Sequence, residues 1–345
     1  MIALLLAAGI ALVVSLVGTP FLISWLRAHD IGQPIIEELA ETHSKKAGTP
    51  TMGGIAIVGG AVTGYVVAHL RDGAVFTWGG MLTMAAIIGA GFVGLLDDLI
   101  KVRSARNLGL TKRTKMIGLL LVAIPFSISV LAKAHVSTQL SFTRLDSLNI
   151  DLGNVLWVVF AVLLFAGFTN AVNLTDGLDG LAAGSASLSF TAYVVIAFWA
   201  FRHVDVYHIP QGLDLALVAA SMVGACAGFL WWNAAPAQII MGDTGALAIG
   251  AGLAAMALVT NTHLLLPVIG GIYVIETLSV MIQVASYRLF KRRVFRMAPI
   301  HHHFELGGWP ETTVIIRFWI LAAMATAMAV AIFYADYLSI PGIIN

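Results

Sequence analysis

Charged residues and cysteines are scarce in this 345-residue chain. Asp, Glu, Lys and Arg make up 11% of it, whereas soluble domains carry about 25%. Hydrophobic residues reach 59%, and the net charge of +1 leaves no basic excess that would indicate a nucleic-acid partner. The single cysteine, Cys226, excludes an internal disulfide. These deficits exclude an ordinary soluble fold and predict an all-α integral membrane protein.

An N-terminal export signal is lacking as well. The chain is apolar from Ile2 onward, without a basic leading region or a convincing cleavage site, so we interpret this segment as a retained first span. A spanning helix needs about 20 apolar residues. The eighth and ninth apolar runs are nearly fused, which makes nine spans the main alternative to ten. The ten runs are 2–25, 53–70, 75–96, 116–134, 153–172, 181–201, 213–233, 244–261, 263–287 and 314–335.

The basic residues orient these spans. With ten spans, the loops alternate between the two faces of the membrane. The loops at 26–52, 97–115 and 288–313 hold 14 of the 19 Lys and Arg residues, and the loops on the other side hold 4. Because Lys and Arg concentrate in cytoplasmic loops, we expect these three loops in the cytoplasm and both termini outside. Without a repeat or a low-complexity linker, residues 1–345 are expected to form a single membrane domain.

Five aspartates gather on the predicted cytoplasmic side. Asp97 and Asp98 close the third predicted span in LLDDLIK, Asp176 and Asp179 open the sixth in NLTDGLDGLA, and Asp243 opens the eighth in MGDTG. An aspartate at a helix N-terminus can simply be a cap. Asp97 and Asp98 instead stand at a C-terminus, where the helix dipole disfavours them, so this adjacent pair indicates a cation partner.

The surroundings of these aspartates suit a metal ion and a phosphate. Hard oxygen ligands favour Mg²⁺, glycines let the backbone approach a ligand, and helix N-termini offer free N–H groups to phosphate. The combination favours metal-assisted phosphoryl transfer between a soluble and a lipid substrate, and no Walker-type loop supports an ATPase. The neighbours concerned are Gly177, Gly180, Gly242, Gly245, Lys101, Arg106, Lys112, Arg113 and Lys115.

The histidine run in APIHHHFELGGW, residues 298–309, lies in the last predicted cytoplasmic loop. A solvated polar turn is one interpretation. Adjacent histidines do not easily converge on one ion and no cysteine assists them, so a zinc site is disfavoured. Imidazoles that bind phosphate or sugar oxygens fit better. Glu276, inside the ninth predicted span, is a weaker candidate, because a buried acid there is either functional or bonded to a neighbouring helix.

Six motifs occur together over nearly the whole chain. The chain closely resembles, through these motifs in this order, the bacterial phospho-N-acetylmuramoyl-pentapeptide transferases of the polyprenyl-phosphate sugar-1-phosphate transferase superfamily. The stretches NLTDGLDGLA and MGDTG fit the whole superfamily, whereas GTPTMGG and APIHHHFE indicate this family. The motifs are KAGTPTMGG (46–54), DDLIKV (97–102), NAVNLTDGLDGLA (170–182), FLWWNAAPAQIIMGDTG (229–245), ETLSVMIQV (276–284) and APIHHHFELGGW (298–309).

The resemblance implies a multi-pass protein of the bacterial inner (plasma) membrane, with ten spans, an active-site cleft at the cytoplasmic face and a homodimer. It implies Mg²⁺-dependent transfer of phospho-MurNAc-pentapeptide from UDP-MurNAc-pentapeptide to undecaprenyl phosphate, which gives lipid I and UMP for peptidoglycan synthesis. It implies Asp243 as the principal Mg²⁺ ligand. The residues implied to be catalytic are Asp97, Asp98, Asp243, Lys115, His302 and His303. Those implied to bind substrate are Lys46, Lys101, Asn173, Asp176, Gly177, Leu178, Asp179, Asn233 and Gln283.

Two departures and two alternatives accompany the resemblance. Ile240 stands where the family usually has phenylalanine, so an aromatic platform for uracil is expected to be missing, and Ala246 replaces the usual serine. A related transferase that uses UDP-GlcNAc is the nearest alternative. An ion-coupled transporter is a different class, but it predicts acids near mid-membrane, where only Glu276 lies. Asp97 and Asp98 stay open as base, nucleophile or outer ligand.

Overall fold

The computed structural model describes residues 1–345 except 30, 33–47, 74, 104–108, 146–147 and 342–345. Within these described ranges, nine helices are long and apolar enough to cross a membrane, which confirms the predicted α-helical membrane protein. These nine helices are α1 (Ile2–Ala28), α3 (Gly54–Asp72), α4 (Trp78–Arg103), α5 (Lys112–Lys133), α6 (Gly153–Thr175), α7 (Leu181–Arg202), α9 (Gly212–Asn233), α10 (Gly242–Val259) and α14 (Glu311–Leu338).

Short elements connect some of these helices. A two-stranded antiparallel sheet between α5 and α6 pairs β1 (Gln139–Leu140) with β2 (Ile150–Asp151). In its register, Gln139 lies opposite Asp151 and Leu140 lies opposite Ile150. The remaining helices are α8 (Val204–Tyr207), α11 (Leu266–Ile269), α12 (Gly271–Phe290) and α13 (Ile300–Glu305).

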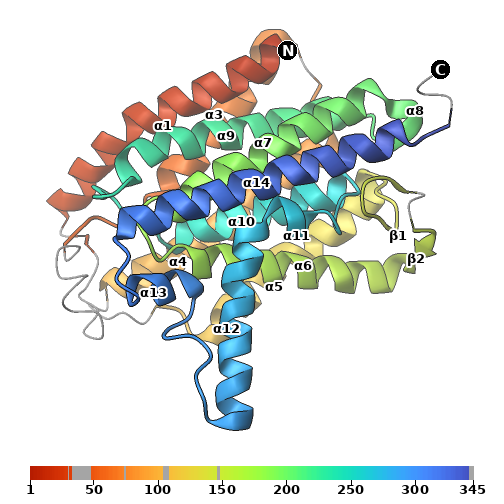
Figure 1. Ribbon diagram of the computed structural model, residues 1–345. Helices are drawn as coiled ribbons and strands as arrows, with labels where there is room; N and C mark the ends of the chain where they lie inside the picture. Colours follow the sequence, from red (N-terminus) through yellow and green to blue (C-terminus); the bar gives the residue numbers. More distant parts are fainter. Residues whose placement is uncertain (30, 33–47, 74, 104–108, 146–147, 342–345) are drawn as a thin grey trace.

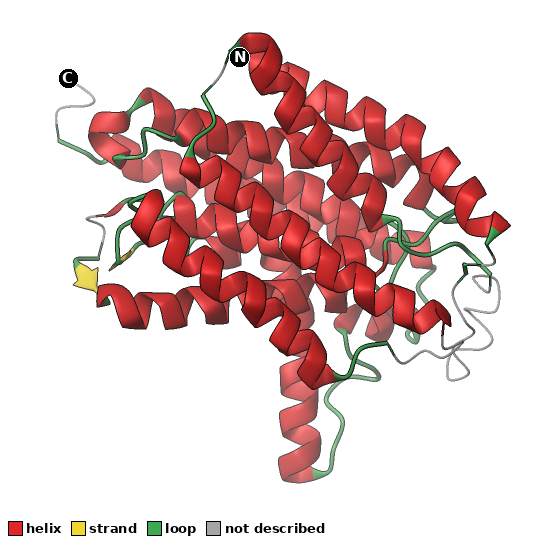
Figure 2. Ribbon diagram, turned by 180° about the vertical axis from the view of Figure 1, so that it is seen from behind, coloured by secondary structure: helices red, strands yellow, loops and turns green. Residues whose placement is uncertain are grey.

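The ninth predicted span, 263–287, is not one straight helix. The structure divides it into α11 and α12 at Gly270, and α12 leaves the bundle at a steep angle (Figure 1, Figure 2). Glycine there lowers the cost of a break, and the short α11 carries a proline in its first turn. Leu289 and Phe290, at the far end of α12, are 73% and 70% exposed. The count of ten spans therefore stays a prediction.

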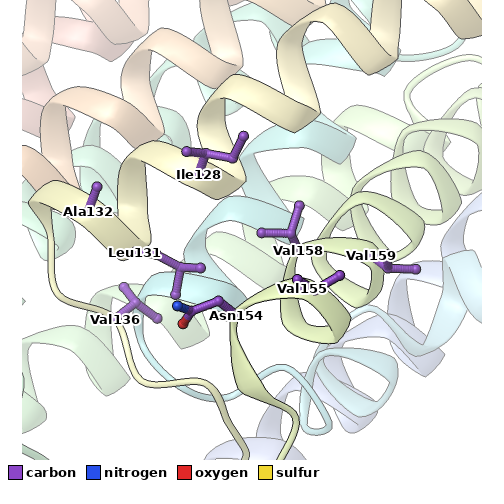
Figure 3. A pocket seen from close by; sticks show the side chains of 8 residues that line it. All are labelled: Ile128, Leu131, Ala132, Val136, Asn154, Val155, Val158 and Val159. Atoms are coloured by element: carbon purple, nitrogen blue, oxygen red, sulfur yellow. The ribbon is translucent and has the colours of Figure 1, made fainter.

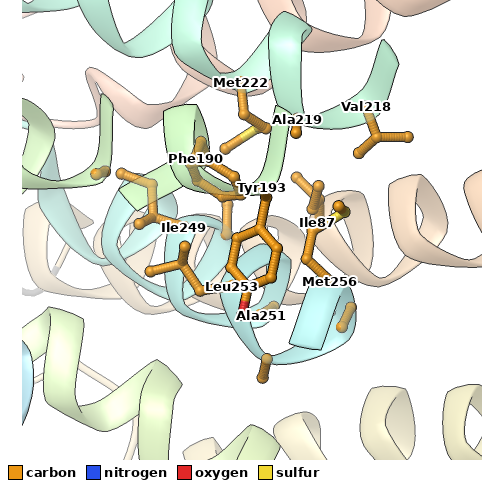
Figure 4. Packing of buried hydrophobic residues seen from close by; sticks show 14 of the residues in the cluster. Ile87, Phe190, Tyr193, Val218, Ala219, Met222, Ile249, Ala251, Leu253 and Met256 are labelled. Carbon is orange, nitrogen blue, oxygen red and sulfur yellow. The ribbon is translucent and has the colours of Figure 1, made fainter. Parts of the chain in front are cut away.

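The centre of the bundle is α10, which is buried on every side from Asp243 to Val259. It packs against α4 and α6, whereas α1 and α14 bury only their inner faces. Figure 4 shows Ile249 and Leu253 of α10 interleaved with Phe190 and Tyr193 of α7. A helix that is apolar on all sides is stable only inside such a shell, so α10 forms the core that the other helices enclose.

The helix directions bring the sequence motifs to one end of the bundle. The C-terminal ends of α4, α6 and α9 meet the N-terminal ends of α7 and α10 there. The start of α1 and the end of α14 lie at the opposite end (Figure 1). The end that holds the aspartates is called the acidic end below.

Candidate active site

Three carboxylates converge between the last turns of α4 and the first turn of α10. Asp97, Asp98 and Asp243 are all buried, and one oxygen from each lies within 4.8 Å of the others. Asp97 and Asp98 are neighbours in the chain, whereas Asp243 comes from a helix that starts more than a hundred residues later. Three hard oxygen donors at this spacing can hold one divalent cation.

Asp98 is tied to the start of α10. Its Oδ2 accepts hydrogen bonds from the backbone N–H and the hydroxyl of Thr244, at 2.9 and 2.7 Å, and its Oδ1 accepts from the N–H of Asp243 at 3.1 Å. A side chain from α4 therefore caps α10, which leaves Asp243 free of that role. Asp98 fixes the distance between the two helices, whereas one oxygen of Asp97 and one of Asp243 face the Lys101 ammonium, which an incoming cation can displace.

Two lysines compensate the negative charge. Lys101 Nζ lies 2.6 Å from Asp97 Oδ2 and 2.8 Å from Asp243 Oδ2, and Lys115 Nζ lies 2.6 Å from the same oxygen of Asp243. With its carboxamide oriented to meet complementary partners, Asn173 donates to Asp243 Oδ1 at 2.7 Å and accepts from Lys115 at 3.1 Å. Both lysines are partly exposed, so their ammonium groups can exchange a carboxylate partner for an incoming phosphate.

Glycines allow this close assembly. Gly242 has a φ of +73°, and a Cβ there would lie 2.6 Å from Asp98 Oδ2. A Cβ at Gly94 would overlap the backbone carbonyl of Asp243, and one at Gly54 would overlap the backbone of Gly245. Small residues at helix contacts let backbones approach closely in membranes. The glycines of GTPTMGG and MGDTG therefore serve helix packing as well as ligand approach.

The segment before α3 is bonded to the segment before α10. Ile240 donates its N–H to the Pro50 carbonyl at 2.8 Å, and its own carbonyl accepts from the Gly53 N–H at 2.9 Å. Gly54 continues the pattern by donating to the Met241 carbonyl at 2.9 Å. The motif GTPTMGG thereby aligns the approach to Asp243, and the half-buried Ile240 lies within this pairing.

The NLTDGLDGLA loop between α6 and α7 is also cross-linked. Asp179 Oδ2 accepts from the Ala237 N–H at 3.0 Å, and Asn233 donates to the Ile239 carbonyl at 2.9 Å, which closes the loop before α10. Burial, together with the negative charges of Asp243 and Asp98, holds the pKa of the Asp176 carboxyl well above its usual range. Leu178 is buried. The loop thus faces the carboxylates with a preset backbone.

Comparison with known proteins matches the segments that build this site. A model described as glycosyl transferase family 4 matches residues 80–261, and one described as phospho-N-acetylmuramoyl-pentapeptide-transferase signature 1 matches residues 46–58. A protein of the latter name from Frankia alni is 51% identical, over 97% of this chain and 98% of its own. The chain belongs to the phospho-N-acetylmuramoyl-pentapeptide-transferase family. Proteins of the same name from Saccharopolyspora erythraea and Mycobacterium leprae are 48% and 46% identical, each over 98% of this chain and over 98% and 99% of their own.

Membership confirms the resemblance and fits the observed architecture. As a member of the phospho-N-acetylmuramoyl-pentapeptide-transferase family, the chain is a transferase and a multi-pass protein of the bacterial inner membrane. The glycosyl transferase model covers the helices that carry Asp97, Asp98, Asp176 and Asp243. The part of the chain that this model leaves out includes α12 and the histidine run.

The structure distributes the three histidines of this family member unequally. His302 pairs with Glu305 at 2.7 Å, and His303 accepts the N–H of Arg296 at 3.1 Å. His301, which the sequence analysis did not select, is fully buried, and its Nδ1 lies 3.1 Å from Oε1 of the equally buried Glu276. Its Nε2 lies against Gly177, where a Cβ would overlap the ring. The sequence signal for this pair was the acidic side chain of Glu276 within an apolar run.

Gln283 and Lys46 are two further residues of the predicted site. Gln283 is bonded to the backbone after α12: its Oε1 accepts from Val294 and Phe295, and its Nε2 donates to the Phe295 carbonyl, each at 3.0 Å. Its carboxamide therefore holds the loop that leads to α13. Lys46 lies outside the described residues.

Proposed function

We propose that the chain transfers phospho-MurNAc-pentapeptide from UDP-MurNAc-pentapeptide to undecaprenyl phosphate, giving lipid I and UMP. The observation that carries this proposal is the buried trio of Asp97, Asp98 and Asp243, which two lysines contact. The chain that holds this trio is about half identical to a protein named phospho-N-acetylmuramoyl-pentapeptide-transferase. The acidic end would face the cytoplasm, both termini would lie outside, and the working unit would be a homodimer with ten spans in each subunit.

The donor set fits Mg²⁺. Asp243 and Asp97 would hold the ion, because both carboxylate oxygens of Asp98 accept hydrogen bonds from the start of α10. The bound ion would neutralise phosphate charge and polarise the β-phosphorus. Lys101 and Lys115 would then turn from the carboxylates to the pyrophosphate oxygens, as their position beside Asp243 allows.

The transfer is a substitution at phosphorus. An oxygen of the lipid phosphate bonds to the β-phosphorus of the nucleotide sugar, and the bond from that phosphorus to the bridging oxygen breaks, so UMP leaves with that oxygen. Asn173, Asp176, Gly177, Leu178, Asp179 and Asn233 would line the nucleotide side, together with Lys46. His302 and His303 would contact the sugar or peptide, and Gln283 would hold the loop that presents them.

A release assay tests the function. Purified protein in detergent, with Mg²⁺ and undecaprenyl phosphate, should release UMP from UDP-MurNAc-pentapeptide and not from UDP-GlcNAc. The carboxylates and lysines face a pyrophosphate that both nucleotides share, so discrimination must come from sugar and peptide contacts. Release from UDP-GlcNAc alone would move the chain to a related transferase class. Protein that unfolds cooperatively on heating but releases no UMP from either nucleotide would contradict the proposal.

Glu276 is proposed as a positioning residue that acts through His301. It meets His301 Nδ1, so it fixes the ring orientation that places Nε2 against the Gly177 loop. Glu276→Gln should lower kcat by about tenfold, because loss of a group that orients an active-site side chain commonly costs that much. The same change in a His301→Ala background should cost nothing further, because contacting residues that act through one another are not additive.

Tyr273→Phe is the matched control for this cycle. Tyr273 lies on the same buried face of α12 and donates to the Ala182 carbonyl at 3.0 Å, so its loss should change stability and leave kcat near wild type. Steady-state UMP release for the four variants measures the coupling. If the Glu276 and His301 losses multiply, Glu276 has a role of its own and the positioning assignment is wrong.

A further inference from the structure

A cavity of about 470 Å³ with several polar side chains in its wall, called the polar cavity below, opens at the end of the bundle opposite the carboxylates. It lies between the start of α4, the end of α5 and the start of α9, and nothing in the proposed transfer uses it. Its wall combines the aromatic rings of Phe76 and Trp78 with the polar side chains of Lys133, His135 and His208.

The charge of this cavity is of one sign. Among the described residues that line it there is no carboxylate, and Lys133 Nζ lies 5.8 Å from the centre of the Trp78 ring, without a described acid partner. Asp214 lies behind Thr77, but Thr77 donates two hydrogen bonds to it and His69 Nε2 lies 3.0 Å from it. The exposed ammonium and imidazole groups are therefore available to an anion.

An unpartnered amide lies on the cavity wall. Asn261 is only 5% exposed, and its side-chain oxygen, buried against the solvent, has no hydrogen-bond partner among the described residues. Buried polar groups are nearly always satisfied, so this acceptor oxygen is open to a hydrogen-bond donor such as a ligand hydroxyl. His135, His208 and Asn261 all have φ between +53° and +54°, in the left-handed region. Each of them follows the end of a helix, so the ends of α5, α8 and α10 meet around this cavity.

An apolar groove adjoins this cavity. It has a volume of about 580 Å³, lies between α5 and α6, and is lined by Ile128, Leu131, Ala132, Val136, Asn154, Val155, Val158 and Val159 (Figure 3). Val136 lines both the groove and the polar cavity. Because α5 and α6 are membrane-spanning candidates, we expect hydrocarbon around the groove, whereas the cavity lies where these helices end.

We propose that the two cavities together bind an anionic phospholipid. The phosphodiester would lie between Lys133 and His208, a hydroxyl of the headgroup would donate to the Asn261 side-chain oxygen, and an acyl chain would pass Val136 into the α5–α6 groove. A cationic pocket beside an apolar groove matches the two chemical halves of such a lipid. The orientation under the proposed function places this lipid in the outer leaflet, but binding depends only on the two cavities.

Native mass spectrometry tests this directly. The protein in detergent is offered equal amounts of phosphatidylglycerol and phosphatidylcholine with identical dioleoyl chains. Wild type should retain phosphatidylglycerol with a preference of roughly fivefold or more, since one cation near a lipid phosphate contributes about 1 kcal/mol. Lys133→Gln combined with His208→Gln should abolish the preference. Arg202→Gln, an exposed basic residue at the same end outside the cavity, should leave it unchanged.

The groove has its own variant. Val158→Trp should reduce retention of both lipids, because it fills the apolar half of the site. Thermal unfolding temperatures show whether each variant is folded, and UMP release is not needed as a readout. Equal retention of the two lipids by wild type, or a preference that survives the Lys133–His208 double change, would overturn the proposal. So would glycerol 3-phosphate that competes as well as phosphatidylglycerol, since the headgroup alone would then suffice.

Discussion

Asp243→Asn is expected to reduce Mg²⁺-dependent UMP release by at least about 100-fold, because positioned catalytic groups commonly contribute that much. The substitution keeps the size of the side chain and removes its charge. Asp243 is the carboxylate that both lysines share and that Asn173 contacts, and the capping of α10 is carried by Asp98. The helix start should therefore stay intact while the metal and phosphate site loses its centre.

Steady-state release over a range of Mg²⁺ concentrations measures this effect. Asp205→Asn is the control, because Asp205 is an exposed acid in α8 at the other end of the bundle. The thermal unfolding temperature should change little in either variant. Turnover of Asp243→Asn near the wild-type level at ordinary Mg²⁺ would remove Asp243 from the metal site.

Gly94→Ala is expected to cost about as much as the loss of a carboxylate. The added methyl group would overlap the carbonyl of Asp243, so α4 and α10 must separate at the point where Asp97 and Asp98 face Asp243. A misplacement of about 1 Å can lower a rate by roughly 100-fold. Stability should fall as well, since α10 is the buried centre of the fold.

Gly167→Ala provides the comparison for this change. Gly167 lies in α6, and a Cβ at that position would meet no atom within 4 Å. Unfolding temperature and UMP release together separate the two positions: both should fall for Gly94→Ala, and neither should fall for Gly167→Ala. An active, stable Gly94→Ala protein would show that the helices can shift without moving the carboxylates.

The location of the carboxylates was predictable from the sequence because hydrocarbon dictates it. Charged side chains stand at the ends of apolar runs, and alternating spans bring every second end to the same side. That reasoning placed Asp97, Asp98 and Asp243 at one end, where the structure also has them. It could not assign different roles to Asp97 and Asp98, because that depends on the rotation of α4 against α10.

The break in the ninth predicted span and the inward histidine escaped prediction for a related reason. Hydropathy averages over a whole run, so a proline within α11 and the glycine break before α12 hardly lower it. Three adjacent histidines on a short helix point in three directions, and the contact of His301 with Glu276 is decided by a partner in another helix. Sequence spacing carries no information on such contacts.

The complete enclosure of α10 has a consequence for how the protein fails under heat. Regions that open by local fluctuation have few buried contacts, whereas the most enclosed segments open only when the whole domain does. Asp243 belongs to the first turn of the most enclosed helix, and its partners Asp97 and Asp98 are packed against that turn. The three carboxylates thus lie in the part of the molecule that unfolds last, so heating should abolish catalysis and tertiary structure in a single transition.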